Sequence, residues 1–194
     1  TLLKKLALYC EVEKENIQTF NGSDFALHYI FACFLNRDTK VLIYNPNYTQ
    51  VDTYVRLYSD NINYSEINNP FEEHSYNFHE IENHDVVYIS NPNNPTGHCL
   101  DPLTIKEYKN LIVTRTFSKG FSLASIRLGY ICCCEELISV INKIRNTKEV
   151  NSFAQVLGEV ALDNIEETNK RIEKVKQNKK KLELLLQKNN IQYI

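Results

Sequence analysis

The residues best suited to chemistry lie in three short segments, each next to an apolar run. In the first, Thr116 to Gly120 (TFSKG) places Lys119 beside two hydroxyl groups, directly after the run LIVTRT. An amine at the end of a strand can attack a carbonyl group and can carry a proton. This segment therefore predicts a reactive lysine at Lys119, with the hydroxyls of Thr116 and Ser118 close to it.

The other two segments could bind an anion and supply amide groups. Asn21-Gly22-Ser23-Asp24 comes just before an apolar segment expected to be a buried helix. Free amides at a helix N-terminus, together with the Ser23 hydroxyl, suit a phosphate group. Asn91 to Gly97 (NPNNPTG) follows the run DVVYIS, and its two prolines and one glycine restrict the backbone. Jointly the three segments predict a phosphate cradle, an amide donor and an amine nucleophile on one face.

A scaffold of alternating strands and helices must position these segments. Strands are expected at 41–44, 62–67, 85–90, 111–116 and 128–133, and helices at 1–12, 25–35, 48–58 and 103–109. A helical pattern runs from Glu135 almost to the end, where 191–194 could begin another strand. Apolar strands alternating with helices predict an α/β fold with three layers around a mostly parallel sheet. In such sheets, ligands bind at the carboxyl ends of the strands.

The composition narrows the class of protein. The 194 residues carry a net charge of −2, which argues against nucleic acid or an anionic membrane as the main partner. No apolar run approaches the roughly 20 residues of a membrane span, and no secretory leader is recognised. The six cysteines show no metal-ligand spacing, so we expect no metal site, and reduced thiols in a cytoplasmic protein.

Two segments of the sequence resemble the signatures of a known enzyme family. NPNNPTG and TRTFSKGFSLASIRLGY are similar to the two signatures of fold-type I aminotransferases of classes I and II, which depend on pyridoxal 5'-phosphate (PLP). NGSDFALHYIF and YNPNYTQVDTY resemble the histidinol-phosphate aminotransferase branch. The resemblance implies a PLP-binding large domain over 1–151, the start of an α+β small domain over 152–194, and a homodimer.

The resemblance also implies roles for the residues around the reactive lysine. Lys119 corresponds to the lysine that binds the cofactor covalently and moves the substrate proton. Arg127 corresponds to the arginine whose planar guanidinium binds the cofactor phosphate. Ser118 and Thr116 correspond to hydroxyls on the phosphate side of the site.

The remaining implied site residues come from the other two segments. Ser23 and the backbone amide of Asp24 correspond to the phosphate-binding loop. Asn94 corresponds to the asparagine that donates a hydrogen bond to the phenolic oxygen of PLP, and Tyr48 to the aromatic residue that stacks on its ring.

Three functions are compatible with these motifs. The first is transfer of an amino group between an amino acid, such as glutamate, and a keto or aldehyde acceptor, such as imidazole-acetol phosphate, the partner of histidinol phosphate. The second is decarboxylation of an O-phosphorylated amino acid on the same scaffold. The third is a catalytically inactive relative that only binds. All but the third predict small-molecule amino-acid and keto-acid substrates.

The sequence departs from the family pattern between the two signatures. The family has a further strand there, ending in an Asp-x-x-Tyr motif whose aspartate keeps the pyridine nitrogen protonated. Here Gly97 and Lys119 are only 22 positions apart, and no such motif lies between them. The N-terminal arm and the C-terminal substrate-binding arginine of the family are also not found. Because the chain also contains no Met, we predict a further segment between about Glu107 and Leu111 that carries this motif.

Overall fold

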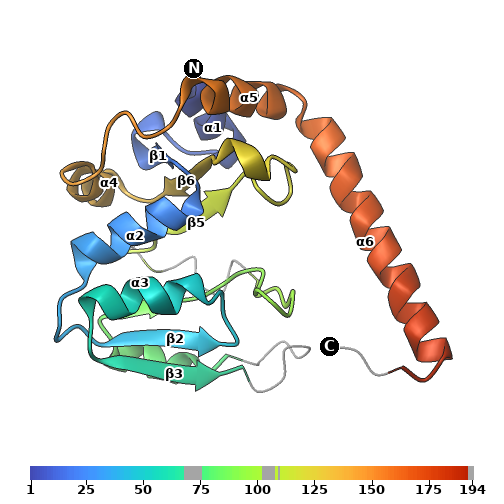
Figure 1. The fold of residues 1–194 in the computed structure, drawn as a ribbon, viewed down its shortest axis with the longest axis horizontal. Helices are drawn as coiled ribbons and strands as arrows, with labels where there is room; N and C mark the ends of the chain where they lie inside the picture. Colours follow the sequence, from blue (N-terminus) through green and yellow to red (C-terminus); the bar gives the residue numbers. More distant parts are fainter. Residues whose placement is uncertain (68–75, 102–107, 109, 192–194) are drawn as a thin grey trace.

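Two small sheets and six α-helices make up the described part of the chain (Figure 1). The structure is a computed structural model that describes residues 1–67, 76–101, 108 and 110–191. The strands are β1 (Ile17–Phe20), β2 (Val41–Asn45), β3 (Ile62–Glu66), β4 (Val86–Tyr88), β5 (Val113–Thr116) and β6 (Gly129–Cys132). The helices are α1 (Leu2–Cys10), α2 (Ser23–Phe34), α3 (Gln50–Tyr58), α4 (Glu135–Asn142), α5 (Ser152–Asp163) and α6 (Ile165–Lys188).

The strands pair differently in the two sheets. One sheet has the order β3-β2-β4 and is parallel, with Val41 opposite both Ile62 and Val86. The other has the order β1-β6-β5 and is antiparallel, with Gly129 opposite both Phe20 and Thr116. The α/β fold with a parallel sheet is therefore confirmed, and parallel pairing is confined to one of the two sheets among the described residues.

The antiparallel sheet has two causes in the sequence. The connection from β5 to β6, residues 117–128, contains a single short 3-10 turn, Ala124–Ile126, and not a crossover helix. Parallel neighbours need a crossover, usually helical, whereas antiparallel neighbours can be joined directly. The second cause is β1, which pairs antiparallel with β6. The sequence did not predict β1, because its residues Gln18 and Thr19 are polar, although both are buried.

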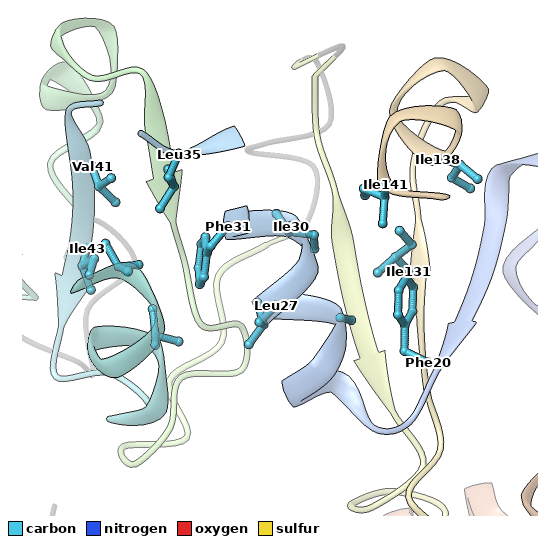
Figure 2. Close-up of a cluster of buried hydrophobic side chains, with 13 residues drawn as sticks. Phe20, Leu27, Ile30, Phe31, Leu35, Val41, Ile43, Ile131, Ile138 and Ile141 are labelled. Carbon is cyan, nitrogen blue, oxygen red and sulfur yellow. The ribbon is translucent and has the colours of Figure 1, made fainter. Parts of the chain in front are cut away.

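Helix α2 lies between the two sheets and is covered on both sides (Figure 2). Leu27 and Phe31 point toward β2 and α3, while Ile30 lies on the side of β6 and α4. Each fully buried side chain of this size contributes about 1.5–3 kcal/mol. The predicted buried helix over 25–35 is therefore confirmed, and its packing fixes the position of its N-terminal residue, Ser23.

A second apolar cluster covers the opposite face of the antiparallel sheet. Leu6 of α1, Phe117, Leu128, Tyr130 of β6 and Ala154 of α5 are all buried in it. Phe117 lies in the segment Thr116 to Gly120, two residues before the predicted reactive lysine. This cluster therefore anchors the base of that segment.

The helical pattern after Glu135 divides into three helices rather than one. The side chain of Asn151 accepts a hydrogen bond from the amide of Ala154 at 2.8 Å and so caps α5. α6 extends away from the two sheets (Figure 1). No described helix is long and apolar enough to span a membrane. The expected helix at 103–109, apart from Tyr108, and the expected strand at 191–194, apart from Ile191, lie outside the described residues.

Candidate active site

The N-terminus of α2 presents amide groups that no side chain of the described residues caps. The first helical hydrogen bond runs from the amide of Ala26 to the carbonyl of Gly22, at 3.4 Å. The amides of Ser23, Asp24 and Phe25 therefore precede the hydrogen-bond ladder of the helix, at the positive end of its dipole. This is the local geometry that binds an anion in many proteins.

Two glycines allow other parts of the chain to approach this helix end closely. Gly22 has φ +85°, and a Cβ atom there would lie 2.6 Å from Nη2 of Arg127. A Cβ atom on Gly129 of β6 would lie 2.6 Å from the carbonyl carbon of Gly22. Because Gly129 also pairs with Thr116, the end of β5, the start of β6 and the start of α2 lie side by side.

Asp24 joins two further side chains to the helix start. The Tyr48 hydroxyl donates to Oδ1 of Asp24 at 3.1 Å, and Nη2 of Arg127 donates to Oδ2 at 3.1 Å. Burial and the neighbouring Asp24 carboxylate both raise the pKa of Tyr48, so the phenol keeps its proton and remains a donor. Only the backbone amide of Asp24 was expected to have a role, but its carboxylate connects Tyr48 to Arg127.

The ion pair between Asp24 and Arg127 fixes the positions of these two side chains but adds little to the stability of the fold. The side chains are 29% and 45% exposed, and pairs of this kind contribute about 0–1 kcal/mol. Nη1 of Arg127 also donates to the carbonyl of Ala124 at 3.2 Å. A guanidinium has five N–H donors, so Arg127 retains donors for an anion after making these two contacts.

Hydrogen bonds restrain the backbone at the start of the lysine segment, whereas Lys119 is exposed. The amide of Phe117 donates to the carbonyl of Leu128 at 3.0 Å, and the amide of Ser118 donates to Oγ1 of Thr116 at 3.1 Å. Thr116 and Ser118 are therefore close to the start of β6, the strand that follows Arg127 in the chain. Lys119 itself is exposed, and no hydrogen bond to another described residue restrains its amine.

The loop Asn91–Gly97 is held in place by Asn93, which was not among the predicted site residues. Asn93 is only 4% exposed. Its Nδ2 donates to the carbonyl of Pro46 at 2.7 Å, and its Oδ1 accepts from Oγ1 of Thr96 at 2.8 Å. The amide of the neighbouring Asn94 donates to Oγ of Ser90 at 3.2 Å. An asparagine between two prolines in a loop was the available signal, because asparagine side chains commonly close turns.

Tyr88 is a further residue in the surroundings of Tyr48 and Asp24 that sequence reasoning did not single out. Burial raises its pKa, and the proximity of Tyr48 and Asp24 raises it further. Tyr88 is the last residue of β4, so it lies at the carboxyl end of a parallel strand, where ligands bind in such sheets. Its position in the run DVVYIS was therefore an available signal.

The structure brings together some of the predicted site residues and leaves others apart. Asp24 contacts both Tyr48 and Arg127. Ser23 and Thr116 both adjoin Gly129, and Ser118 joins them only through its hydrogen bond to Thr116. Within the described ranges, no hydrogen bond joins the exposed side chains of Asn94 and Lys119 to this group. No cluster of three or more His, Cys, Asp or Glu among the described residues could hold a metal ion.

The arrangement fits a phosphorylated ligand. Gly22 lets the guanidinium of Arg127 lie against the start of α2, and Gly129 lets β6 lie against the same helix end. An uncapped helix N-terminus, with Ser23 as its first residue, and an arginine therefore lie side by side. Because amides and guanidinium groups are preferred phosphate ligands, these residues suit the phosphate of a cofactor such as PLP.

Two curated proteins with sequences similar to this chain are both aminotransferases. A dihydroxyacetone phosphate transaminase of Campylobacter jejuni is 31% identical over 205 residues, covering 85% of this chain and 54% of that protein. A histidinol-phosphate aminotransferase of Clostridium novyi is 28% identical, covering 90% of this chain and 58% of that protein. The chain thus spans little more than half the length of these relatives.

Solved structures share the fold. A histidinol-phosphate aminotransferase of Sinorhizobium meliloti in complex with PLP matches with a TM-score of 0.76 at 21% identity, over 87% of this chain and 56% of that chain. An L-threonine-O-3-phosphate decarboxylase of Porphyromonas gingivalis matches with a TM-score of 0.69 at 23% identity, over 83% of this chain and 57% of that chain.

The family model described as aminotransferase class I and II matches residues 1–107 and 101–194, which together include the whole sequence. Its members depend on PLP, the cofactor that the Sinorhizobium meliloti enzyme carries. The chain belongs to the class I and II aminotransferase family.

Proposed function

We propose that the protein of which this chain forms part is a PLP-dependent aminotransferase that acts on a phosphorylated substrate. The observation that carries the proposal is the close approach of the Arg127 guanidinium and of β6 to the uncapped start of α2, which Gly22 and Gly129 permit. Lys119 follows on the segment that the same sheet anchors.

The residues at this helix start would share the binding of the cofactor. The guanidinium of Arg127, the amide of Ser23 and the hydroxyl of Ser118 would bind the phosphate. Thr116 accepts the amide of Ser118, which orients Ser118, and its own O–H remains available as a further donor. The Asp24 carboxylate holds Arg127 and Tyr48, and because the arginine offsets its charge, it need not repel a phosphate.

The reactive part of the cofactor would lie toward Lys119 and Tyr48. The Lys119 amine would hold the cofactor through its aldehyde group, and the same amine would serve as the base for the proton on the substrate Cα. The ring of Tyr48 would stack on the cofactor, with its hydroxyl anchored on Asp24. The Asn94 amide would donate to the phenolic oxygen. When bound, PLP withdraws electrons from the substrate Cα.

The names of the relatives favour a phosphorylated substrate. Dihydroxyacetone phosphate and histidinol phosphate, in the names of the two curated relatives, share a phosphate ester. We therefore infer that the protein transfers an amino group between an amino acid, such as glutamate, and a phosphorylated carbonyl compound. Imidazole-acetol phosphate is the first compound to test.

Decarboxylation of an O-phosphorylated amino acid is the competing function, because a decarboxylase shares this fold. The two reactions differ in their products. Incubation of the holoprotein with histidinol phosphate and 2-oxoglutarate should give glutamate without carbon dioxide. Release of carbon dioxide from phosphothreonine, without formation of a keto acid, would contradict the proposal. No product from either substrate would favour the inactive relative.

We also propose that the protein has a further internal segment near Glu107 to Leu111, a region in which Glu107 and Lys109 lie outside the described residues. Two findings support it. The family model matches in two pieces that meet at residues 101–107. The alignment with the Campylobacter jejuni enzyme is 205 positions long, longer than this chain, although it covers only 85% of it.

The intact mass of the purified protein tests this segment. A mass clearly above 22.7 kDa, with an Asp-x-x-Tyr motif in the peptides between Gly97 and Lys119, is the expected result. A mass at that value would mean that the group protonating the pyridine nitrogen is missing, and the inactive relative would then be the better proposal.

A further inference from the structure

A cluster between α1 and the antiparallel sheet has no role in the proposed function. It consists of two cysteines, Cys10 and Cys132, with Tyr130 and Arg115 in their surroundings. Cys10 is the last residue of α1, and Cys132 is the last residue of β6. Sγ of Cys10 donates to the hydroxyl of Tyr130 at 3.6 Å. Cys10 and Cys132 are both half-buried, and both pack against the apolar cluster that contains Tyr130.

Strand geometry selects Cys132 from three consecutive cysteines. Side chains alternate between the two faces of a strand, so Tyr130 and Cys132 share one face of β6. Cys133 packs instead against the cluster around α2 on the other face. Cys10 can therefore meet Cys132 but not Cys133.

The surroundings of Cys10 favour its thiolate. The neighbouring Cys132 thiol, the Tyr130 hydroxyl and the charge of Arg115 on β5 together lower the pKa of Cys10 to about 6, although burial opposes them. Burial raises the pKa of Cys33 and raises that of Cys133 to about 12. Thiolates are the reactive form of cysteine, and neighbouring cations and donors are what activate them.

We propose that Cys10 and Cys132 form an oxidisable dithiol site that reacts with peroxides, with Cys10 as the nucleophile and Cys132 as the resolving thiol. The geometry that carries the proposal is the contact of Cys10 with Tyr130 at the end of α1, together with the position of Cys132 on the same face of β6 as Tyr130 and against the same apolar cluster.

The reaction balances with a peroxide as the oxidant. The Cys10 thiolate attacks one oxygen of hydrogen peroxide, an S–O bond forms, the O–O bond breaks, and hydroxide leaves and is protonated to water. The Cys132 sulfur then attacks the Cys10 sulfur, the S–O bond breaks, and hydroxide leaves with the Cys132 proton as a second water. The two sulfurs lose two electrons, and the peroxide is reduced to two waters. The product is a disulfide that joins α1 to β6.

Mass spectrometry of the full-length protein tests the proposal. Treatment with equimolar hydrogen peroxide should give a species lighter by two hydrogens, in which the peptide of Cys10 is linked to the peptide of Cys132. Cys132→Ser should stop the reaction at a sulfenic acid on Cys10 that dimedone labels. Cys133→Ser, the matched control, should form the linked peptide as the wild type does.

A second measurement needs no variant. At pH 7, iodoacetamide should alkylate Cys10 at least about tenfold faster than Cys33, because only Cys10 has neighbours that stabilise a thiolate. Equal rates would overturn the proposal. A linked peptide that survives in Cys132→Ser but is lost in Cys133→Ser would overturn it as well.

Discussion

The two ends of the candidate site are built in different ways. At one end, the proposed anion-binding group of Ser23, Asp24, Tyr48 and Arg127 is fixed by hydrogen bonds and by close backbone approach. At the other end, Lys119 is exposed, and its amine has no hydrogen-bond partner among the described residues. The contacts within the fold therefore fix the first end, whereas they leave the amine of Lys119 unrestrained.

This contrast separates binding from chemistry. Variants of the anion-binding group should weaken cofactor binding according to the strength of the hydrogen bonds that each substitution removes. Variants of Lys119 should remove the chemistry while the fold and much of the noncovalent affinity remain. The following predictions test this division, beginning with the largest expected effect.

Replacing Lys119 should have the largest effect on activity. Lys119→Ala removes the nucleophile and the proton carrier, and loss of such a group costs about 10²–10⁴-fold in turnover. We expect the visible absorption of covalently bound PLP to disappear and the melting temperature to stay unchanged. Lys143→Ala, at another exposed lysine, is the control and should keep both. Retention of the wild-type visible band in Lys119→Ala would refute the assignment.

Replacing Arg127 should have the largest effect on cofactor affinity. A hydrogen bond to a charged group is worth about 1.5–3 kcal/mol, so Arg127→Ala should weaken PLP binding by about 10–100-fold. Asn94→Ala should lose less, because it removes a single neutral donor. Titration of PLP into the apo-protein measures both. The phosphate assignment would be abandoned if the two variants bound equally well.

Gly129→Ala tests the close packing behind the anion-binding group. The added Cβ would lie 2.6 Å from the carbonyl carbon of Gly22, and overpacking of this kind costs about 1–3 kcal/mol of unfolding free energy. Gly120→Ala is the matched control, since its Cβ would meet only a side-chain carbon of Ile172 at 3.5 Å. Urea unfolding of both variants gives the comparison, and equal midpoints would show that the approach is looser than described.

Tyr48→Phe should have the smallest effect. It keeps the ring that would stack on the cofactor and removes the hydroxyl that donates to Asp24, so it removes no proposed contact with the phosphate. We expect PLP affinity to fall by less than about tenfold and the visible absorption to persist. A decrease as large as that of Arg127→Ala would mean that the hydroxyl contacts the cofactor directly.

Much of the scaffold could be predicted because its elements are locally encoded. α2 and β2 are continuous apolar runs ended by turn residues, and both were expected where they occur. β1 was missed because its Gln18 and Thr19 are buried only through long-range pairing with β6. A polar residue that is covered by tertiary contacts leaves no trace in a local apolar pattern.

The same limit applies to the candidate site. The lysine and asparagine loops were found because motifs mark them, but the carboxylate role of Asp24 depends on Tyr48 and Arg127, which are distant in sequence. Gly129 offered a usable signal, because a glycine inside a strand often marks a close backbone approach. Only the structure identifies the backbone that it approaches, at Gly22.

Chemical trapping of the cofactor on the protein tests the central claim most directly. Borohydride reduction of the full-length holoprotein, followed by proteolysis and mass spectrometry, would convert any covalent link between PLP and a lysine into a stable bond. We predict a phosphopyridoxyl group on Lys119 and on no other lysine. An unmodified Lys119, or a phosphopyridoxyl group mainly on another lysine, would contradict the assignment of Lys119 as the reactive amine.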